Sequence, residues 1–311
     1  MHLTIQQLRI FEAVARNSSV TRAAEELFLT QPAISIQTKR LEENIGYPLF
    51  EHIGKRMFLT VAGEVLYQAS RDILDRIIDL EGSLDERAGK VRGPLRLSVV
   101  TTAKYFMPHL LGAFLKLHPD VEPRLTVTNR AKVLTRLNDN SDDLVIMGQV
   151  PEELDVEAHQ FLNNNLVVVA HPDHPLARRK REISLKQIVE ERFLVREEGS
   201  GTRSAVDRLL AENGLRITPF MELGSGEAIK QGVMAGIGVS ALSTLSVRLE
   251  QSTGLLTPLK VEGFPLVRPW HCVHHRHKHL SKTAQSFRDF LLEKGEALLK
   301  ESAVGYHKGW R

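Results

Sequence analysis

Hydroxyl side chains stand at three points in the sequence where a strand-like run gives way to a helix-like run. They belong to Thr101 with Thr102, to Thr202 and to Ser225. The first backbone amides of a helix have no partner within the helix, and together with hydroxyl donors they favour a bound anion. Helix capping alone would use the same hydroxyls and is the alternative for each of them taken singly. The sequence therefore predicts a site for a small anion.

The segment around Thr202 combines several kinds of anion-binding group. Two glycines let the backbone approach a ligand closely, and two hydroxyls can donate hydrogen bonds. A guanidinium can donate two parallel hydrogen bonds to a phosphate or carboxylate. These residues are Gly199, Ser200, Gly201, Thr202 and Arg203. Together with Lys104 from the first turn, we expect them to form a cleft to which two lobes contribute.

Imidazole and thiolate groups are concentrated near the C-terminus, and both are good ligands for zinc or copper. They are His271, Cys272, His274, His275, His277 and His279. On a strand, Cys272 and His274 face one side and His271 faces the other, so a tetrahedral set would need partners from elsewhere in the chain. We expect a structural strand followed by a polar turn, and no metal.

Two patterns typical of enzymes are incomplete. Gly236-x-Gly238-x-x-Ala241 resembles a dinucleotide-binding fingerprint, but it leaves a helix and enters a strand, which reverses the required order. No Cys–His or Ser–His–Asp set has a recognisable local spacing, which leaves a triad assembled only in space as the alternative. We expect no enzyme activity and no cofactor other than the small anion.

A second group of polar side chains lies at the start of a helix expected after Thr30. Such a helix can reach base edges in the major groove with Gln31, Ser35 and Gln37, while Pro32 fits its first turn. Cations would hold the phosphate backbone, and the candidates are Arg22, Lys39, Lys55 and Arg56. The alternative is that Gln31 and Ser35 are capping residues and that the cations are merely solvated.

Three short helices are expected in the first 46 residues, beginning near Ile5, Thr21 and Thr30. Thr4 and Gln7 form a capping box for the first of them. Residues 49–59 then alternate loosely around a glycine and predict a hairpin with His52, Lys55 and Arg56 at its tip. Residues 1–60 therefore predict an all-α winged helix-turn-helix domain that binds DNA.

The pattern changes to one long helix over residues 61–92. Ile73, Ile77, Leu80 and Leu84 are spaced by four, three and four residues, which is typical of a coiled-coil seam. The segment holds seven acidic and five basic residues, a balance unsuited to lying along phosphates. We expect this linker helix to form a homodimer.

Beyond Gly93-Pro94, nine strand-like runs alternate with helix-like runs, a pattern typical of α/β architecture. The runs cover residues 95–100, 124–128, 143–148, 166–170, 193–196, 220–223, 237–241, 256–261 and 269–274. A final helix is expected over residues 282–300. The sequence of the tail, residues 301–311, indicates no function.

A segment of about 200 residues is large enough to form two lobes, each with its own core, and we expect two rather than one. We expect lobe I to comprise residues 93–163 and 268–300, and lobe II to comprise residues 164–267. The polar segments near 163–165 and 263–269 are the expected crossings and hinges between the lobes.

The composition is that of an ordinary soluble globular protein, with 311 residues of which 42% are hydrophobic and 25% are charged. One cysteine excludes a disulfide framework and fits a reducing cytoplasm. No apolar run approaches the roughly 20 residues that cross a bilayer, and the N-terminus has no signal-peptide pattern. The net charge of +3 is too small to indicate nucleic-acid binding, which must rest on where residues are placed.

Several short motifs follow one another through the first 63 residues. They are Ala23-Ala24-Glu25-Glu26-Leu27, Thr30-Gln31-Pro32-Ala33-Ile34-Ser35, Leu41-Glu42, Gly46-x-x-Leu49-Phe50 and Thr60-x-x-Gly63. In order and spacing they resemble the helix-turn-helix signature of LysR-type transcriptional regulators, and the resemblance extends to about Leu299.

Four downstream motifs, 99–106, 142–149, 199–203 and 221–225, look like those of the CbbR-type subgroup, which regulates RuBisCO and carbon-fixation operons. The resemblance implies a two-lobed effector domain similar to periplasmic binding proteins, and it adds Gly148 and Gln149 to the effector site. It implies a phosphorylated or carboxylated effector such as ribulose 1,5-bisphosphate or 2-phosphoglycolate, with NADPH as a further candidate.

The helix-turn-helix domain and the linker helix predict binding of double-stranded DNA at a pseudo-palindromic operator by two copies of the chain. The resemblance implies a tetramer of copies, and RNA polymerase is a further expected partner. Ile36 and His52 stand where many relatives have arginine, and Gly226 stands where the subgroup more often has asparagine. A LysR-type regulator with a carboxylate or sulfur-compound inducer and a free-standing solute-binding protein are the alternatives; activation versus repression stays open.

Overall fold

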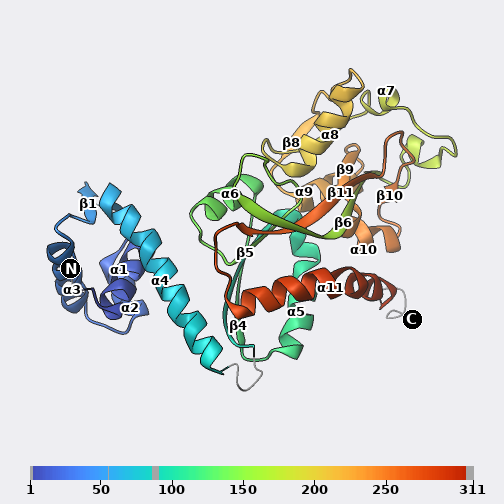
Figure 1. The fold of residues 1–311 in the computed structure, drawn as a ribbon. Coiled ribbons are helices and arrows are strands. Elements are labelled where there is room, and N and C mark those ends of the chain that lie inside the picture. The colour runs from blue at the N-terminus through green and yellow to red at the C-terminus, as the bar shows by residue number, and fades with distance from the viewer. Residues whose placement is uncertain (1–2, 55, 86–90, 306–311) are drawn as a thin grey trace. The chain divides into compact units, whose positions relative to one another are not determined.

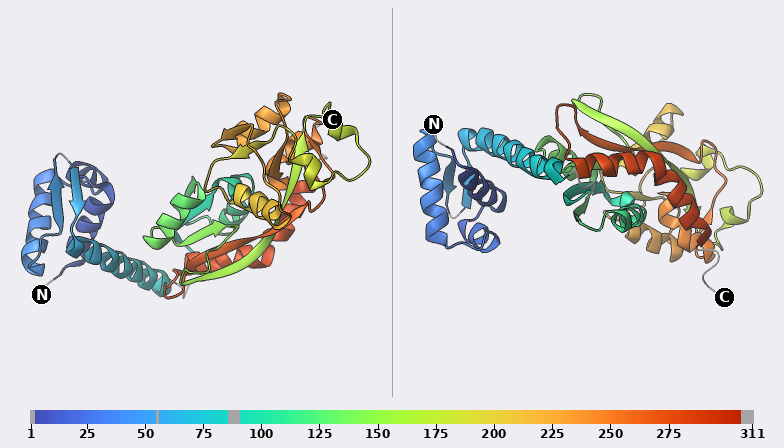
Figure 2. Two further views of the ribbon diagram at one scale, coloured as in Figure 1. Left: turned by 90° about the horizontal axis from the view of Figure 1, so that it is seen from above. Right: turned by 60° about the horizontal axis from the view of Figure 1, so that its bottom comes forward.

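The computed structural model describes residues 3–54, 56–85 and 91–305. The chain divides into two compact units, Met1–Lys90 and Val91–Arg311, and each is described here by itself. The first unit is mostly helical, whereas the second surrounds a large sheet (Figures 1 and 2). Among the described helices, none combines the length and the apolar character needed to span a lipid bilayer.

The first unit opens with three short helices, α1 (Ile5–Asn17), α2 (Val20–Glu26) and α3 (Gln31–Ile45). The predicted capping box is present, because the Thr4 hydroxyl accepts from the backbone N–H of Gln7 and the Gln7 side chain accepts from that of Thr4. Ser19 caps α2, which therefore starts one residue earlier than predicted. Gly46 ends α3 with a left-handed φ of 84°.

A hairpin follows α3, formed by β1 (Phe50–Ile53) and its antiparallel partner β2 (Arg56–Leu59). The Glu42 carboxylate of α3 accepts from the backbone N–H groups of Leu49 and Phe50, at 2.8 and 3.3 Å. Leu49 is fully buried against Phe11 and Leu41. The root of the hairpin is therefore fixed on α3, while its described tip residues are exposed.

The long helix expected after the hairpin is α4 (Val61–Asp85). Four large apolar side chains along it are exposed: Val61 (83%), Val65 (69%), Ile73 (42%) and Leu80 (59%). Ile77 is half-buried, and the side chain of Leu84, which completes the predicted seam, lies outside the described residues. Apolar side chains gathered on one face of a helix mark a surface that a partner covers.

The second unit is built on a seven-stranded sheet in the order β10-β6-β11-β5-β3-β4, with β9 also paired to β6. The strands are β3 (Gly93–Val100), β4 (Val121–Thr128), β5 (Leu144–Met147), β6 (Val156–Ala170), β9 (Ser240–Ser243), β10 (Thr257–Pro258) and β11 (Leu266–His275). β3 runs parallel to β4 and β5, whereas β11 is antiparallel to β5 and β6. A parallel pair, β7 (Leu194–Arg196) and β8 (Met221–Leu223), lies apart from it.

Helices cover both faces of the sheet near β3. Alternate strand residues point to opposite faces, and Ile146 packs with α5 (Met107–Leu117) and α11 (Lys282–Gly305) while Val145 packs with α6 (Arg130–Asn138). The 3-10 helix η2 (Thr101–Tyr105) joins β3 to α5. α11 extends five residues past its predicted end at Lys300.

The part of the chain after β6 has two further apolar clusters. One contains side chains of η3 (Pro175–Arg178), α7 (Leu185–Ile188) and α8 (Gly201–Glu212). The other contains side chains of α9 (Gly226–Met234) and α10 (Thr244–Ser252). Strands between layers of helices are the α/β architecture that the alternation predicts.

The two segments predicted as polar crossings are mostly strand. Asn164 and Asn165 pair with Arg268 and Val267 within a ladder that runs from Leu166–Leu266 to Val156–His275. Asparagine and proline have low strand propensity, which is why local patterning indicates a loop here. Tertiary pairing overrides that preference, so both expected crossings lie within or next to the paired strands β6 and β11.

Cys272, the single cysteine of the chain, is fully buried on β11. Burial raises the pKa of its thiol to about 12, so the reactive thiolate is scarce near neutral pH. We expect iodoacetamide to leave Cys272 unmodified in the folded protein and to alkylate it after unfolding in guanidinium, as read by mass spectrometry. Rapid alkylation of the folded protein would show instead that β11 opens locally.

Candidate functional site

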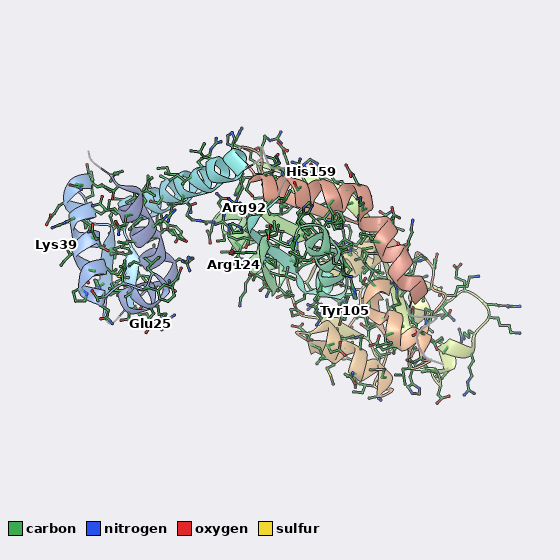
Figure 3. The ribbon with its side chains drawn as sticks, turned by 90° about the horizontal axis from the view of Figure 1, so that it is seen from below. Glu25, Lys39, Arg92, Tyr105, Arg124 and His159 are labelled. Carbon is green, nitrogen blue, oxygen red and sulfur yellow. The ribbon has the colours of Figure 1, made fainter. Side chains whose placement is uncertain are left out.

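One side of α3 carries a row of polar side chains. Gln31, Ser35 and Lys39 are spaced by four residues and are all exposed, whereas Ile34 of the same helix is fully buried. Lys39 lies on the outer side of the helix in Figure 3. The Gln31 amide donates to the Thr21 hydroxyl at 3.0 Å, so α2 orients the first side chain of the row. The row is a surface of hydrogen-bonding groups ending in a cation.

The other predicted DNA contacts stand in different positions. Gln37 is half-buried and lies about 160° around the helix axis from Ser35, on the opposite flank. Ile36, beside Ser35, is 53% exposed; an apolar side chain there can contact a thymine methyl group, a role that the motif comparison did not suggest. Lys55 lies outside the described residues. The remaining candidates are exposed, and they are Arg22, Pro32 and Arg56.

A cleft in the second unit lies where four strands end. β3, β4, β5 and β7 lead into Thr101, Asn129, Gly148 and Glu197, all of which line it. Its empty volume is about 480 Å³, including space open to solvent. Ligands of α/β proteins bind outside the carboxyl ends of the strands, so this is the expected position for a site.

Seven residues predicted for the anion site line this cleft, namely Thr101, Thr102, Gly148, Gln149, Ser200, Gly201 and Thr202. Two of the helices at the cleft, η2 and α8, begin without a side-chain capping hydrogen bond, so the hydroxyls there are not used as caps. The Thr101 hydroxyl lies 3.4 Å from an Arg196 nitrogen and accepts from it. The cleft therefore combines helix N-termini with hydroxyls that do not cap those helices.

Four residues predicted for the same site do not line the cleft, namely Lys104, Gly199, Arg203 and Ser225. Arg203 donates to the Glu222 carboxylate at 2.6 Å. Ser225 accepts from the first amides of α9 and thus follows the capping alternative. Lys104 lines a separate hollow, where its ammonium lies 5.1 Å from the centre of the Tyr105 ring. Gly199 is exposed with a φ of 80°, which suits glycine at the turn before α8.

Three arginines that the motif analysis did not select also line the cleft: Arg130, Arg196 and Arg268. Burial, followed by the charges of Arg130 and Arg208, lowers the pKa of Arg268 below its ordinary value. The Nε of Arg130 is buried and has no hydrogen-bond partner among the described residues. These two guanidinium groups are therefore held in an unfavourable state that a bound anion would relieve.

Arg196 differs from the other two in its partners. It is 6% exposed and forms a bidentate pair with Glu197 at 2.6 and 2.7 Å. Arg130 and Arg268 donate instead to the backbone carbonyl oxygens of Gln149 and Gly201, at 3.5 and 2.5 Å. A carbonyl does not neutralise a guanidinium, so the cleft presents two positive charges to a ligand.

Both units match family models. Residues 5–64 match the model of the bacterial regulatory helix-turn-helix protein of the lysR family, and residues 88–296 match the LysR substrate binding domain.

Curated relatives are similar over nearly their whole length. The chain is 47% identical over 292 residues to the RuBisCO operon transcriptional regulator of Allochromatium vinosum, covering 94% of this chain and 96% of that protein. It is 45% identical over 295 residues to the HTH-type transcriptional activator CmpR of Synechocystis, covering 95% and 97%.

Solved structures are similar in fold. The regulatory domain of Synechocystis CcmR in complex with 2-PG matches with a TM-score of 0.62 and 43% identity, covering 65% of this chain and 96% of that domain. Full-length OxyR from Pseudomonas aeruginosa matches with a TM-score of 0.74 at 22% identity, covering 96% and 97%, a likeness that concerns the fold alone.

Proposed function

Because this chain belongs to the LysR family of bacterial transcriptional regulators, we propose that it controls carbon-fixation genes in response to a small anion bound in the cleft of its second unit. The names of its relatives, a RuBisCO operon regulator and the activator CmpR, support the choice of target genes and a role as activator. The observation that carries the effector proposal is the pair of uncompensated guanidinium groups, Arg130 and Arg268, in the cleft.

The effector that fits best carries a phosphate and a carboxylate on a short skeleton, as 2-phosphoglycolate does. Two arginine charges match the phosphate, and the amides and hydroxyls at Thr101, Thr102 and Thr202 can hold the rest. The binding of 2-PG by the CcmR domain, at 43% identity, supports this class. Ribulose 1,5-bisphosphate and NADPH are the competing effectors for the experiment below.

The effector acts through the arrangement of the lobes. Ser200 and Gly201 reach the cleft from one lobe and Thr101 from the other, so a bound anion favours the closed arrangement. A ligand changes DNA binding only if it prefers one arrangement of the oligomer to another. Closure of the lobes therefore rotates the subunits with respect to each other and changes how they hold the operator.

The oligomer that binds DNA is a dimer joined along α4, and dimers pair into a tetramer. The exposed row Val61, Val65, Ile73 and Leu80 supports α4 as the contact. Two α3 helices then read half-sites one turn of DNA apart, roughly 34–36 Å, in a pseudo-palindromic operator. RNA polymerase is the further partner of an activator at such a promoter.

Footprinting on a carbon-fixation promoter tests the proposal, with and without 2-phosphoglycolate, ribulose 1,5-bisphosphate and NADPH at several salt concentrations. We expect protection of a pseudo-palindromic site and an altered footprint with the effector. An altered footprint with only NADPH would replace the proposed effector, and equal affinity for promoter and random duplex would refute the regulatory role.

The row on α3 and the hairpin are expected to contribute differently to DNA binding. Gln31→Ala should relax the preference for one base pair, because a base contact is worth about 1–3 kcal/mol of discrimination. Arg56→Ala should weaken binding to all sequences and reduce the salt slope by about one unit, because it removes one phosphate contact. Competition between operator and scrambled duplexes over a salt series measures both, and equal, sequence-independent losses would contradict this division.

A further inference from the structure

Three potential metal ligands lie together on the paired strands β6 and β11. Glu157 is the direct cross-strand partner of His274, and His159 is the partner of Cys272. Residues two apart on a strand share a face of the sheet, so the carboxylate and the two imidazoles project from the same side. One ligand atom from each of Glu157, His159 and His274 lies within 4.8 Å of the other two.

His274 presents an unused nitrogen to this cluster. The residue is only 4% exposed, and its Nδ1 lies 2.9 Å from the backbone carbonyl oxygen of His275. A carbonyl oxygen can only accept, so Nδ1 carries the proton and Nε2 keeps its lone pair. That Nε2 is buried and has no hydrogen-bond partner in the described part of the chain. An imidazole held by its second nitrogen in this way is the usual state of a metal-ligating histidine.

His159 repeats the feature from the neighbouring strand. Its Nε2 is likewise buried with no hydrogen-bond partner among the residues that the structure covers. It lies 3.6 Å from a Glu157 carboxylate oxygen, and the Nε2 of His274 lies 3.7 Å from the same oxygen. Ligands at about 2.0–2.1 Å from a tetrahedral zinc ion are about 3.4 Å apart. The two distances to the Glu157 oxygen are within a few tenths of an ångström of that value, and the ligand atoms of the two histidines lie within 4.8 Å of each other.

We propose that Glu157, His159 and His274 bind a divalent transition-metal ion of the zinc type, with water in the remaining position. Two imidazoles and one carboxylate are an established ligand set for such ions. The site has an entry path, because the side chains of His159 and Glu157 are 34% and 42% exposed while that of His274 forms its floor. His274, for which the C-terminal segment offers no complete ligand set, acquires partner ligands from β6.

The charges around the site are compatible with a bound cation. Arg288 of α11 adds a positive charge that opposes a cation, but its guanidinium donates to the Asp289 carboxylate at 2.9 Å. The ligand carboxylate of Glu157 supplies a negative charge directly.

The metal site is separate from the effector cleft but uses the same two strands. Asn164 on β6 and Arg268 on β11 line the cleft, and they lie five and six residues along their strands from His159 and His274. At about 3.3 Å per residue, that is roughly 17–20 Å. A metal ion would therefore join β6 to β11 on the lobe I side of the crossing.

Metal binding to the full-length, tag-free protein tests the proposal after chelation and removal of the chelator. Titration with ZnCl2 is expected to give one tightly bound ion per chain, and CoCl2 is expected to give the visible absorption of low-coordinate Co²⁺. His159→Gln and Glu157→Gln should each lower the Zn²⁺ affinity at least about tenfold and abolish the Co²⁺ band. Both side chains are partly exposed, so the variants should fold, and circular dichroism checks this.

His277→Gln is the matched control, because His277 pairs with the Asp155 carboxylate at 3.4 Å but is 86% exposed and stands outside the cluster. It should leave the Zn²⁺ affinity and the Co²⁺ spectrum unchanged. A loss of binding in His277→Gln equal to that in His159→Gln would assign the metal to the exposed histidines instead. Absence of the Co²⁺ band in the unmodified protein would also overturn the proposal.

Discussion

Replacing Arg268 with glutamine is expected to lower the affinity for 2-phosphoglycolate by roughly 30-fold to a few thousand-fold. Removing one partner of a buried charge pair costs about 2–5 kcal/mol, which corresponds to that range. Arg268 is the side chain for which the cost should be high, because its half-buried guanidinium donates to the Gly201 carbonyl and faces the repelling charges of Arg130 and Arg208. The variant should still bind operator DNA without effector, since α3 and the hairpin belong to the other unit.

Calorimetry with 2-phosphoglycolate and a duplex shift assay measure the two properties separately. Arg203→Gln is the control, because it removes an arginine in the first turn of α8 that already pairs with Glu222 at 2.6 Å and does not line the cleft. We expect its effector affinity to change less than about threefold, a difference below 1 kcal/mol. If Arg203→Gln loses the effector and Arg268→Gln keeps it, the assignment of the cleft is wrong.

Gly63→Ala is expected to lower the free energy of unfolding of the first unit by about 2 kcal/mol. Near the melting temperature of the variant's first unit, operator binding should be lost. Gly63 lies in the first turn of α4, where an added Cβ would overlap the backbone carbonyl oxygen of Leu49 at the root of the hairpin. That oxygen already accepts from the N–H of Thr60 at 3.0 Å, so it cannot move away without breaking this bond. For a domain of this size, 2 kcal/mol lowers the melting temperature by roughly 8–16 °C.

Gly112→Ala is the matched control for Gly63→Ala. Gly112 also lies in a helix, α5 of the second unit, but a Cβ there meets nothing within 4 Å. Alanine is a better helix former than glycine by about 1 kcal/mol, so this variant should be neutral or slightly stabilised. Thermal unfolding of both full-length variants, followed by circular dichroism, compares them. An unchanged first transition in Gly63→Ala would show that the hairpin can move off α4.

The sequence predicts the first unit well because its signals are local. Thr4 with Gln7 and Thr30 are caps whose bonds form within three residues, and Gly46 ends its helix through its own φ. No such signal marks the crossing strands, since Asn164 and Arg268 have partners more than 100 residues away. Their strand structure depends on pairing that a local pattern does not contain.

The same distinction explains which cleft residues can be predicted. Thr101, Ser200 and Thr202 sit at strand-to-helix turns, and the structure places them along the cleft. Arg130 obeys the same rule, since it follows β4 and opens α6, so attention to every such turn could have found it. Arg268 could not be found in this way, because it lies within a strand and reaches the cleft only through the pairing of β11 with β6.

The pairing of β6 with β11 also determines how the second unit can be divided. The chain leaves along β6 and returns along β11, so residues 171–265 are an insertion whose two connections are hydrogen-bonded to each other. A fragment truncated at the crossing would expose an unpaired strand edge, and such edges promote aggregation by pairing with other chains. The two lobes should therefore melt in a single calorimetric transition and resist excision by limited proteolysis.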